Sequence, residues 1–120
     1  TNKIMHTDIA VSATCVRVPV LRSHSEAVTI HCEKEVDVEK AREVLNSFED
    51  VEVMDDVANN QYPMPIISTD TDTTFVGRIR KDIFDNKILH FWVVADQVRV
   101  GAATNAVRIA KKWIEMEGKK

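Results

Sequence analysis

ILHFWVVAD, residues 88–96, is the stretch of sequence that decides the fold. Its unbroken apolar run at residues 93–95 is typical of a strand with neighbours on both sides, whereas an edge strand usually alternates with polar residues. Residues 75–81, FVGRIRK, place β-branched side chains among charged ones and predict a second strand. A turn at residues 82–87 would join the two, so we expect residues 88–96 near the centre of a sheet.

Three more stretches predict strands. Residues 9–18 (IAVSATCVRV) are rich in β-branched residues, and residues 27–33 (AVTIHCE) alternate between apolar and polar. Residues 51–54 are apolar enough for a short strand, whereas residues 55–72 carry asparagine and proline turn signals and predict a loop.

Two helices complete the predicted fold. Residues 37–48 (DVEKAREVLNSF) place apolar side chains at three- and four-residue steps, with Asp37 as the candidate N-cap. A second helix is predicted from Gly101 to about Met116, with alanines along one broad face. The sequence therefore predicts an α+β fold, a mixed and largely antiparallel sheet with helices on one face, plus a C-terminal helix.

Composition limits the class of protein. The chain has 120 residues, of which 44% are hydrophobic and 29% charged, which fits one soluble globular domain. A net charge of −3 argues against a nucleic-acid surface, and the apolar runs are too short to cross a membrane. Two cysteines at a spacing that matches no zinc or redox signature favour a cytoplasmic protein with reduced thiols.

The string ATCVRVPVLRSHSE, residues 13–26, contains the candidate chemistry. Arg17 offers a forked cation for a carboxylate or phosphate, and His24 can move a proton near neutral pH. The alternative is a solvated arginine and a loop histidine bonded to its serine neighbours. The aspartates at 55, 56, 70 and 72 complete no oxygen-ligand loop, so we expect no metal site and interpret them as solvated loop charges.

Four strings together resemble a known family, and the resemblance extends over essentially the whole chain. They are SATCVRVPVLRSHSE (12–26), DDVANNQYPMP (55–65), TFVGRIRKD (74–82) and FWVVADQVRVGAATNAVRIA (91–110). In this order they resemble the C-terminal portion of bacterial aspartate-semialdehyde dehydrogenase. The resemblance implies that residues 1–120 belong to the catalytic and dimerisation domain. It also implies that the terminal helix, from about residue 101, packs on the nucleotide-binding domain, and that the protein is a homodimer formed through the sheet.

The family's activity is implied by the same resemblance. The family interconverts L-aspartate 4-semialdehyde plus phosphate and 4-phospho-L-aspartate with NADP, on the route to lysine, threonine and methionine. A cysteine thiolate attacks the aldehyde, hydride leaves to the nicotinamide, and phosphate releases the thioester. By matching motif, Arg17 corresponds to the arginine that binds the substrate carboxylate, His24 to the acid/base histidine, and Asn105 to a residue near the nicotinamide of NADP.

Two departures from the family pattern bear on activity. The chain has three glycines and no glycine-rich dinucleotide loop, and Cys15 does not occupy the place of the nucleophilic cysteine. Thr1 in place of an initial methionine fits a fragment, so we expect this chain alone to be inactive. The alternatives are a non-catalytic α+β interaction or regulatory module and a small-molecule sensor with Arg17 as anion clamp.

Overall fold

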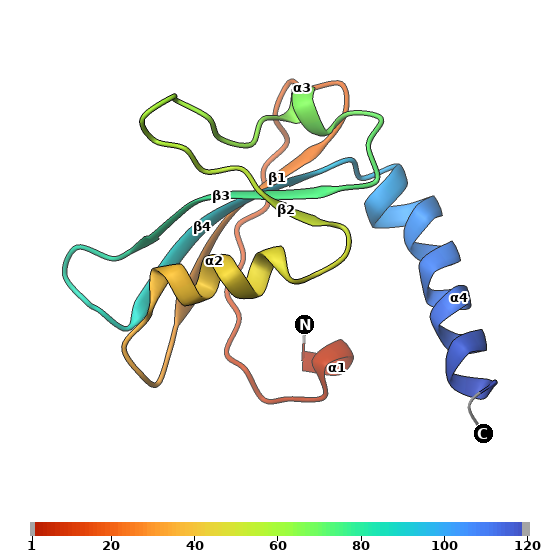
Figure 1. Ribbon diagram of the computed structural model, residues 1–120, viewed down its shortest axis with the longest axis horizontal. Coiled ribbons are helices and arrows are strands. Elements are labelled where there is room, and N and C mark those ends of the chain that lie inside the picture. Colours follow the sequence, from red (N-terminus) through yellow and green to blue (C-terminus); the bar gives the residue numbers. More distant parts are fainter. Residues whose placement is uncertain (1, 119–120) are drawn as a thin grey trace.

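A four-stranded sheet forms the centre of the computed structural model, which describes residues 2–118 (Figure 1). Its strands are β1 (His24–His31), β2 (Val51–Val53), β3 (Thr74–Lys81) and β4 (Ile88–Ala95), in the order β1-β4-β3-β2. β4 pairs antiparallel with β1 and β3, and β2 pairs parallel with β3. The α+β class, the mixed and largely antiparallel sheet and the central position of residues 88–96 are thereby confirmed.

The helices are α1 (Asn2–Met5), α2 (Val38–Asn46), α3 (Pro65–Ser68) and α4 (Thr104–Glu117), with a π-helical turn η1 (Arg99–Ala103) leading into α4. The two predicted helices are confirmed as α2 and α4. Asp37 caps α2 as predicted, because its Oδ1 accepts the Lys40 N–H at 3.0 Å. The single turns α1 and α3 were not predicted, and α3 begins with proline at the position where proline fits a helix.

The main core lies between α2 and one face of the sheet. Its buried members are Val36, Val76, Ile79 and Leu89, and apolar side chains of α2 pack against them. Val76 and Ile79 share this face although they are three residues apart, because β3 contains a bulge between Gly77 and Arg80. The bulge therefore places Ile79 as well as Val76 on the face that packs against α2.

The connection after β2 covers part of the opposite face. Gly77 and Trp92 pair there, and the Trp92 indole N–H donates to the carbonyl of Pro63 at 3.2 Å. A Cβ on Gly77 would lie 2.5 Å from Pro63 Cδ and would also collide with the Met54 carbonyl oxygen. Glycine at position 77 therefore lets this connection cross directly over β3.

The predicted strand at residues 9–18 is wrong, because this segment forms neither helix nor strand. Its apolar side chains are exposed: Ile9, Val11, Val16 and Val18. A strand needs a neighbour for its N–H and C=O groups, and the segment pairs with neither of the two edge strands, β1 and β2. Among the described residues nothing pairs with the segment, so its favourable composition does not produce a strand.

α4 projects away from the sheet (Figure 1). The helix has the predicted apolar side chains, but they are exposed, with 67% of Trp113 and 69% of Ile114 accessible. Within residues 2–118, no helix is long and apolar enough to span a bilayer.

Gly77→Ala should lower the free energy of unfolding by about 1–3 kcal/mol, since the added methyl group meets fixed backbone. Gly101→Ala is the matched control, because its nearest neighbour is the Gln97 Cβ at 3.9 Å. That substitution should leave stability unchanged or raise it by up to about 1 kcal/mol, as alanine favours helix. Urea unfolding of both variants measures the difference, and equal midpoints would contradict the close approach at Gly77.

Candidate functional site

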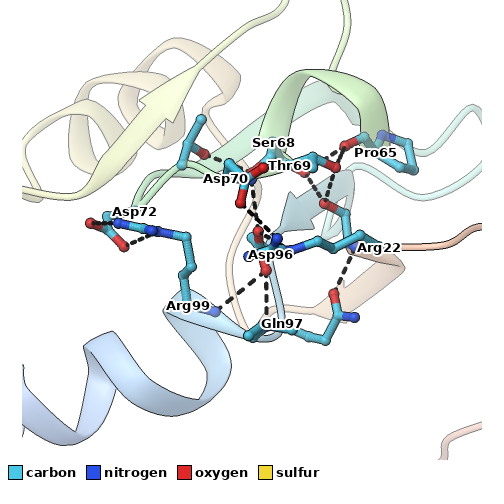
Figure 2. Close-up of polar contacts among 12 residues, drawn as sticks. Arg22, Pro65, Ser68, Thr69, Asp70, Asp72, Asp96, Gln97 and Arg99 are labelled. Carbon is cyan, nitrogen blue, oxygen red and sulfur yellow. Dashed lines mark hydrogen bonds and ion pairs between the residues drawn. The ribbon is translucent and has the colours of Figure 1, made fainter.

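A buried carboxylate, that of Asp96, organises the sheet where β4 ends (Figure 2). Asp96 follows β4 and its side chain is fully buried. Asp96 Oδ2 accepts the Asp70 N–H at 2.8 Å, and Oδ1 accepts the N–H groups of Val98 and Arg99 at 2.9 and 3.4 Å. One carboxylate therefore joins the connection before β3 to the first turn of the C-terminal helical region.

Arg22 supplies the positive charge for this carboxylate. Its Nε lies 2.8 Å from Asp96 Oδ2, in an ion pair rather than a well-directed hydrogen bond, and its Nη1 lies 2.6 Å from Asp70 Oδ1. Burial favours the protonated form of Asp96, but the backbone N–H donors and Arg22 outweigh it and hold the pKa below its usual value. Asp96 is therefore charged and paired at neutral pH.

Ser23 is held on three sides. Its backbone N–H donates to Gln97 Oε1 at 2.7 Å, and its hydroxyl accepts from Ser68 at 2.7 Å and lies 3.3 Å from the Thr69 hydroxyl. Ser23 has a φ of 78° and is 3% exposed, so a strained backbone is fixed in a buried position. Such strain persists only where surrounding contacts enforce it, and it is common at functional sites.

The contacts of Ser23 with Gln97, Ser68 and Thr69 form a clamp on its backbone and hydroxyl. His24 comes directly after this clamp. It is the first residue of β1 and pairs with Ala95 across the sheet. Its side chain is exposed, and within residues 2–118 it forms no hydrogen bond or ion pair. The backbone of His24 is therefore fixed by its neighbours, while the imidazole is accessible to a substrate.

A second set of contacts anchors the start of α4. Asp72 accepts from Arg99 Nε and Nη2, both at 2.8 Å, and from the Thr104 hydroxyl at 2.7 Å. These Arg99 and Thr104 hydrogen bonds lower the pKa of Asp72 to about 2. Arg108 adds contacts to the Asp72 carbonyl at 2.7 Å and to Asp50 at 2.8 Å.

The interpretation of the four aspartates as solvated loop charges is wrong for two of them. Asp72 pairs with Arg99, and Asp55, whose side chain is buried, pairs with Arg42 at 2.6 Å. Asp70 contacts Arg22 but stays exposed in its loop. Each arginine is distant in sequence from its aspartate, so only the folded chain reveals the pairing. Asp56 remains a local turn residue that accepts the N–H groups of residues 58 and 59.

The structure does not bring the other two predicted site residues into contact with His24. Arg17 lies in the exposed segment before β1, and Asn105 lies exposed in the first turn of α4. In the described part of the chain, neither side chain has a hydrogen bond or ion pair. The roles of Arg17, His24 and Asn105 therefore stay predictions.

Sequence analysis missed the buried Asp96 and Ser68 of this site, together with the half-buried Arg22 and Gln97. A signal for Asp96 exists, since an aspartate between a strand and a helix is a typical N-cap. No comparable signal exists for Gln97, because its partner Ser23 is 74 positions away.

The residues present do not form a dinucleotide site by themselves. No glycine-rich loop is present, and Asn105 offers a single exposed amide. Within residues 2–118, no three or more histidine, cysteine, aspartate or glutamate side chains are grouped to hold a metal ion.

Comparison with known proteins identifies the family. A family model described as "Semialdehyde dehydrogenase, dimerisation domain" matches residues 1–100. The chain belongs to this dimerisation-domain family.

Relatives of the semialdehyde dehydrogenase family match nearly all of the chain. An aspartate-semialdehyde dehydrogenase of Campylobacter jejuni is 64% identical over 99% of the chain, and one of Aquifex aeolicus is 55% identical over 96%. The chain covers 35% and 34% of these two proteins. It therefore spans about a third of the length of its semialdehyde dehydrogenase relatives.

Solved structures agree with this assignment. The aspartate semialdehyde dehydrogenase II of Vibrio cholerae, complexed with ASA, matches 85% of the chain with a TM-score of 0.78 and 38% identity. The enzyme of Francisella tularensis matches 92% with a TM-score of 0.78 and 31% identity. The chain covers 30% and 32% of these structures, respectively.

Gln97→Ala should lower the free energy of unfolding by about 1–3 kcal/mol, because it leaves the buried Ser23 N–H without an acceptor. It should also shift the amide resonances of Ser23 and His24, since the clamp precedes β1. Gln61→Ala is the control, because that exposed side chain has no hydrogen bond among the described residues. Urea unfolding and amide NMR spectra measure both effects, and unchanged Ser23 and His24 resonances would show that Gln97 does not hold this turn.

Proposed function

We propose that this chain is the C-terminal part of an aspartate-semialdehyde dehydrogenase, an oxidoreductase of amino-acid biosynthesis. The complete enzyme would convert L-aspartate 4-semialdehyde and phosphate to 4-phospho-L-aspartate with NADP, on the route to lysine, threonine and methionine. The observation that carries this proposal is the clamp on Ser23, which fixes the backbone of an accessible His24 in a chain 64% identical to such an enzyme.

His24 is proposed as the acid/base residue. An imidazole exchanges a proton near neutral pH, and thiol addition to an aldehyde followed by acyl transfer needs a group that takes and returns one. Its exposure leaves the ring free to reach a substrate, while Ser23, Gln97 and Asp96 hold the backbone that carries it. These three act on His24 as positioning residues.

Arg17 is proposed as the substrate-binding residue. A guanidinium binds a carboxylate through two parallel hydrogen bonds, which fixes the orientation of an amino-acid substrate. The exposed Arg17 side chain has no acidic partner among residues 2–118, so its donors are available. Its position seven residues before His24 keeps the two groups on one short segment.

NADP is proposed as the cofactor of the complete enzyme, with Asn105 near the nicotinamide. NADP would accept the hydride when bound. This chain contributes no phosphate-binding loop, and its two cysteines are not placed as the nucleophile, so the chain alone should be inactive. The nucleotide-binding domain of the complete enzyme would supply the missing groups and would cover the exposed apolar face of α4.

The activity is tested in a chimera in which residues 1–120 replace the matching segment of the Campylobacter jejuni relative. The chimera should form NADPH from L-aspartate 4-semialdehyde and phosphate, whereas the 120-residue chain should not. His24→Ala should lower kcat by about 10²- to 10⁴-fold, because proton transfer is lost. Arg17→Gln should raise KM for the semialdehyde by about tenfold or more, because a charged hydrogen bond is lost.

His31→Ala is the control for the chimera, since His31 is exposed at the other end of β1 and has no assigned role. It should leave kcat and KM unchanged. If His24→Ala retains full turnover, the acid/base assignment is wrong. An inactive chimera with native secondary structure would favour a non-catalytic interaction module.

A homodimer formed through the sheet is proposed as well. β1 is an edge strand whose residues are exposed apart from the half-buried Val28, which leaves room for a second subunit. Sedimentation velocity of the 120-residue chain should therefore show a dimer. Trp113→Ala should leave it intact, because α4 is proposed to face the nucleotide-binding domain. A monomer at all concentrations would contradict the dimer, and its loss in Trp113→Ala would place the contact on α4.

A further inference from the structure

A cavity of about 290 Å³ lies at the sheet edge where β2 ends and β3 continues. Its lining comes from α2, from the connection after β2 and from the bulged part of β3. None of the residues that contact Asp96 or Ser23 lines it. The charged residues of the lining are three arginines, Arg42, Arg78 and Arg80, and two aspartates, Asp55 and Asp56. The lining therefore carries a net charge of +1.

Both aspartates are already occupied by other donors. Asp55, whose side chain is 4% exposed, accepts Arg42 Nη2 at 2.6 Å and the N–H groups of Arg78 and Ile79 at 2.7 and 3.0 Å. Asp56 accepts the side-chain amide of Asn59 at 2.7 Å in addition to backbone N–H groups. Neither carboxylate is bonded to the side chain of Arg78 or Arg80.

The guanidinium groups of Arg78 and Arg80 are held without an acidic partner. Arg78 lies over the ring of Tyr62, 5.9 Å from its centre, in a cation–π contact. Arg80 Nη1 donates to the Arg78 carbonyl at 2.8 Å. Within residues 2–118 neither forms an ion pair, so most of their N–H donors have no acceptor from the protein.

We propose that this cavity binds a small oxyanion, a phosphate or carboxylate group, between Arg78 and Arg80. Forked guanidinium groups match the oxygens of either group, and contacts within the protein already hold both arginines in place. The volume lies at the lower limit of ligand pockets, roughly 300–1,000 Å³, so the site fits a small anion and not a dinucleotide. This site is independent of the proposed roles of Arg17 and His24.

The test is a titration of the 120-residue chain with inorganic phosphate and, separately, with succinate, at ionic strength held constant with sodium chloride. Saturable shifts of the Arg78 and Arg80 side-chain NMR signals are expected. Shifts with phosphate alone, with succinate alone or with both support the site and identify the anion that it takes. Arg80→Gln should weaken binding by about tenfold.

Arg78→Asn is a second variant with the same expected loss, because asparagine tolerates the φ of 56° at this position. Lys111→Gln removes the same charge from exposed α4 and should bind as the unaltered chain does. Circular dichroism confirms that each variant is folded.

Two kinds of result would overturn the proposal. Shifts that do not saturate, or that weaken equally in Lys111→Gln and Arg80→Gln, would show general charge screening. Shifts lost in Arg17→Gln but kept in Arg80→Gln would place the anion at the proposed substrate arginine. That second result would leave the proposed function intact.

Discussion

The buried carboxylate of Asp96 is the constraint on which the end of the sheet depends. A charge without access to water needs donors on every side, and Asp96 takes them from Arg22, Asp70 and the residues at 98 and 99. Three stretches far apart in sequence must therefore meet at one point. His24 comes two residues after Arg22, so the same requirement fixes where β1 begins.

Local sequence patterns predicted the elements whose causes are local. α2 has its cap and its apolar spacing within a few residues, and β4 carries the apolar run of a central strand. The segment at residues 9–18 has a strand-like composition, but composition specifies no neighbour, and none is present in the described chain. The bulge in β3 was hidden for a similar reason, since it depends on contacts of Asp55 with the backbone of Arg78 and Ile79.

The candidate site, like the fold, was predictable from the sequence only in part. Resemblance to a family identified Arg17, His24 and Asn105 as residues in a motif. The groups that hold His24 in place were not predictable, because the contact of Ser23 with Gln97 joins positions 74 residues apart. The residues next to an aspartate in a loop also do not reveal whether its carboxylate is solvated or paired with a distant arginine. For this reason Asp55 and Asp72 were misinterpreted until the arginines that pair with them were located.

One arrangement recurs at the site and at the arginine cavity. Ser23, Asp70 and Arg78 have positive φ angles without being glycine, and the N–H of each donates to a side-chain oxygen, of Gln97, Asp96 and Asp55 respectively. A residue in this conformation cannot place its N–H in a regular ladder, so an acceptor from another segment compensates for the strain. Two of the three positions lie beside a residue proposed here as functional: Ser23 directly precedes His24, and Arg78 lies two residues before Arg80. The fold thus holds the backbone next to both proposed residues without a ligand.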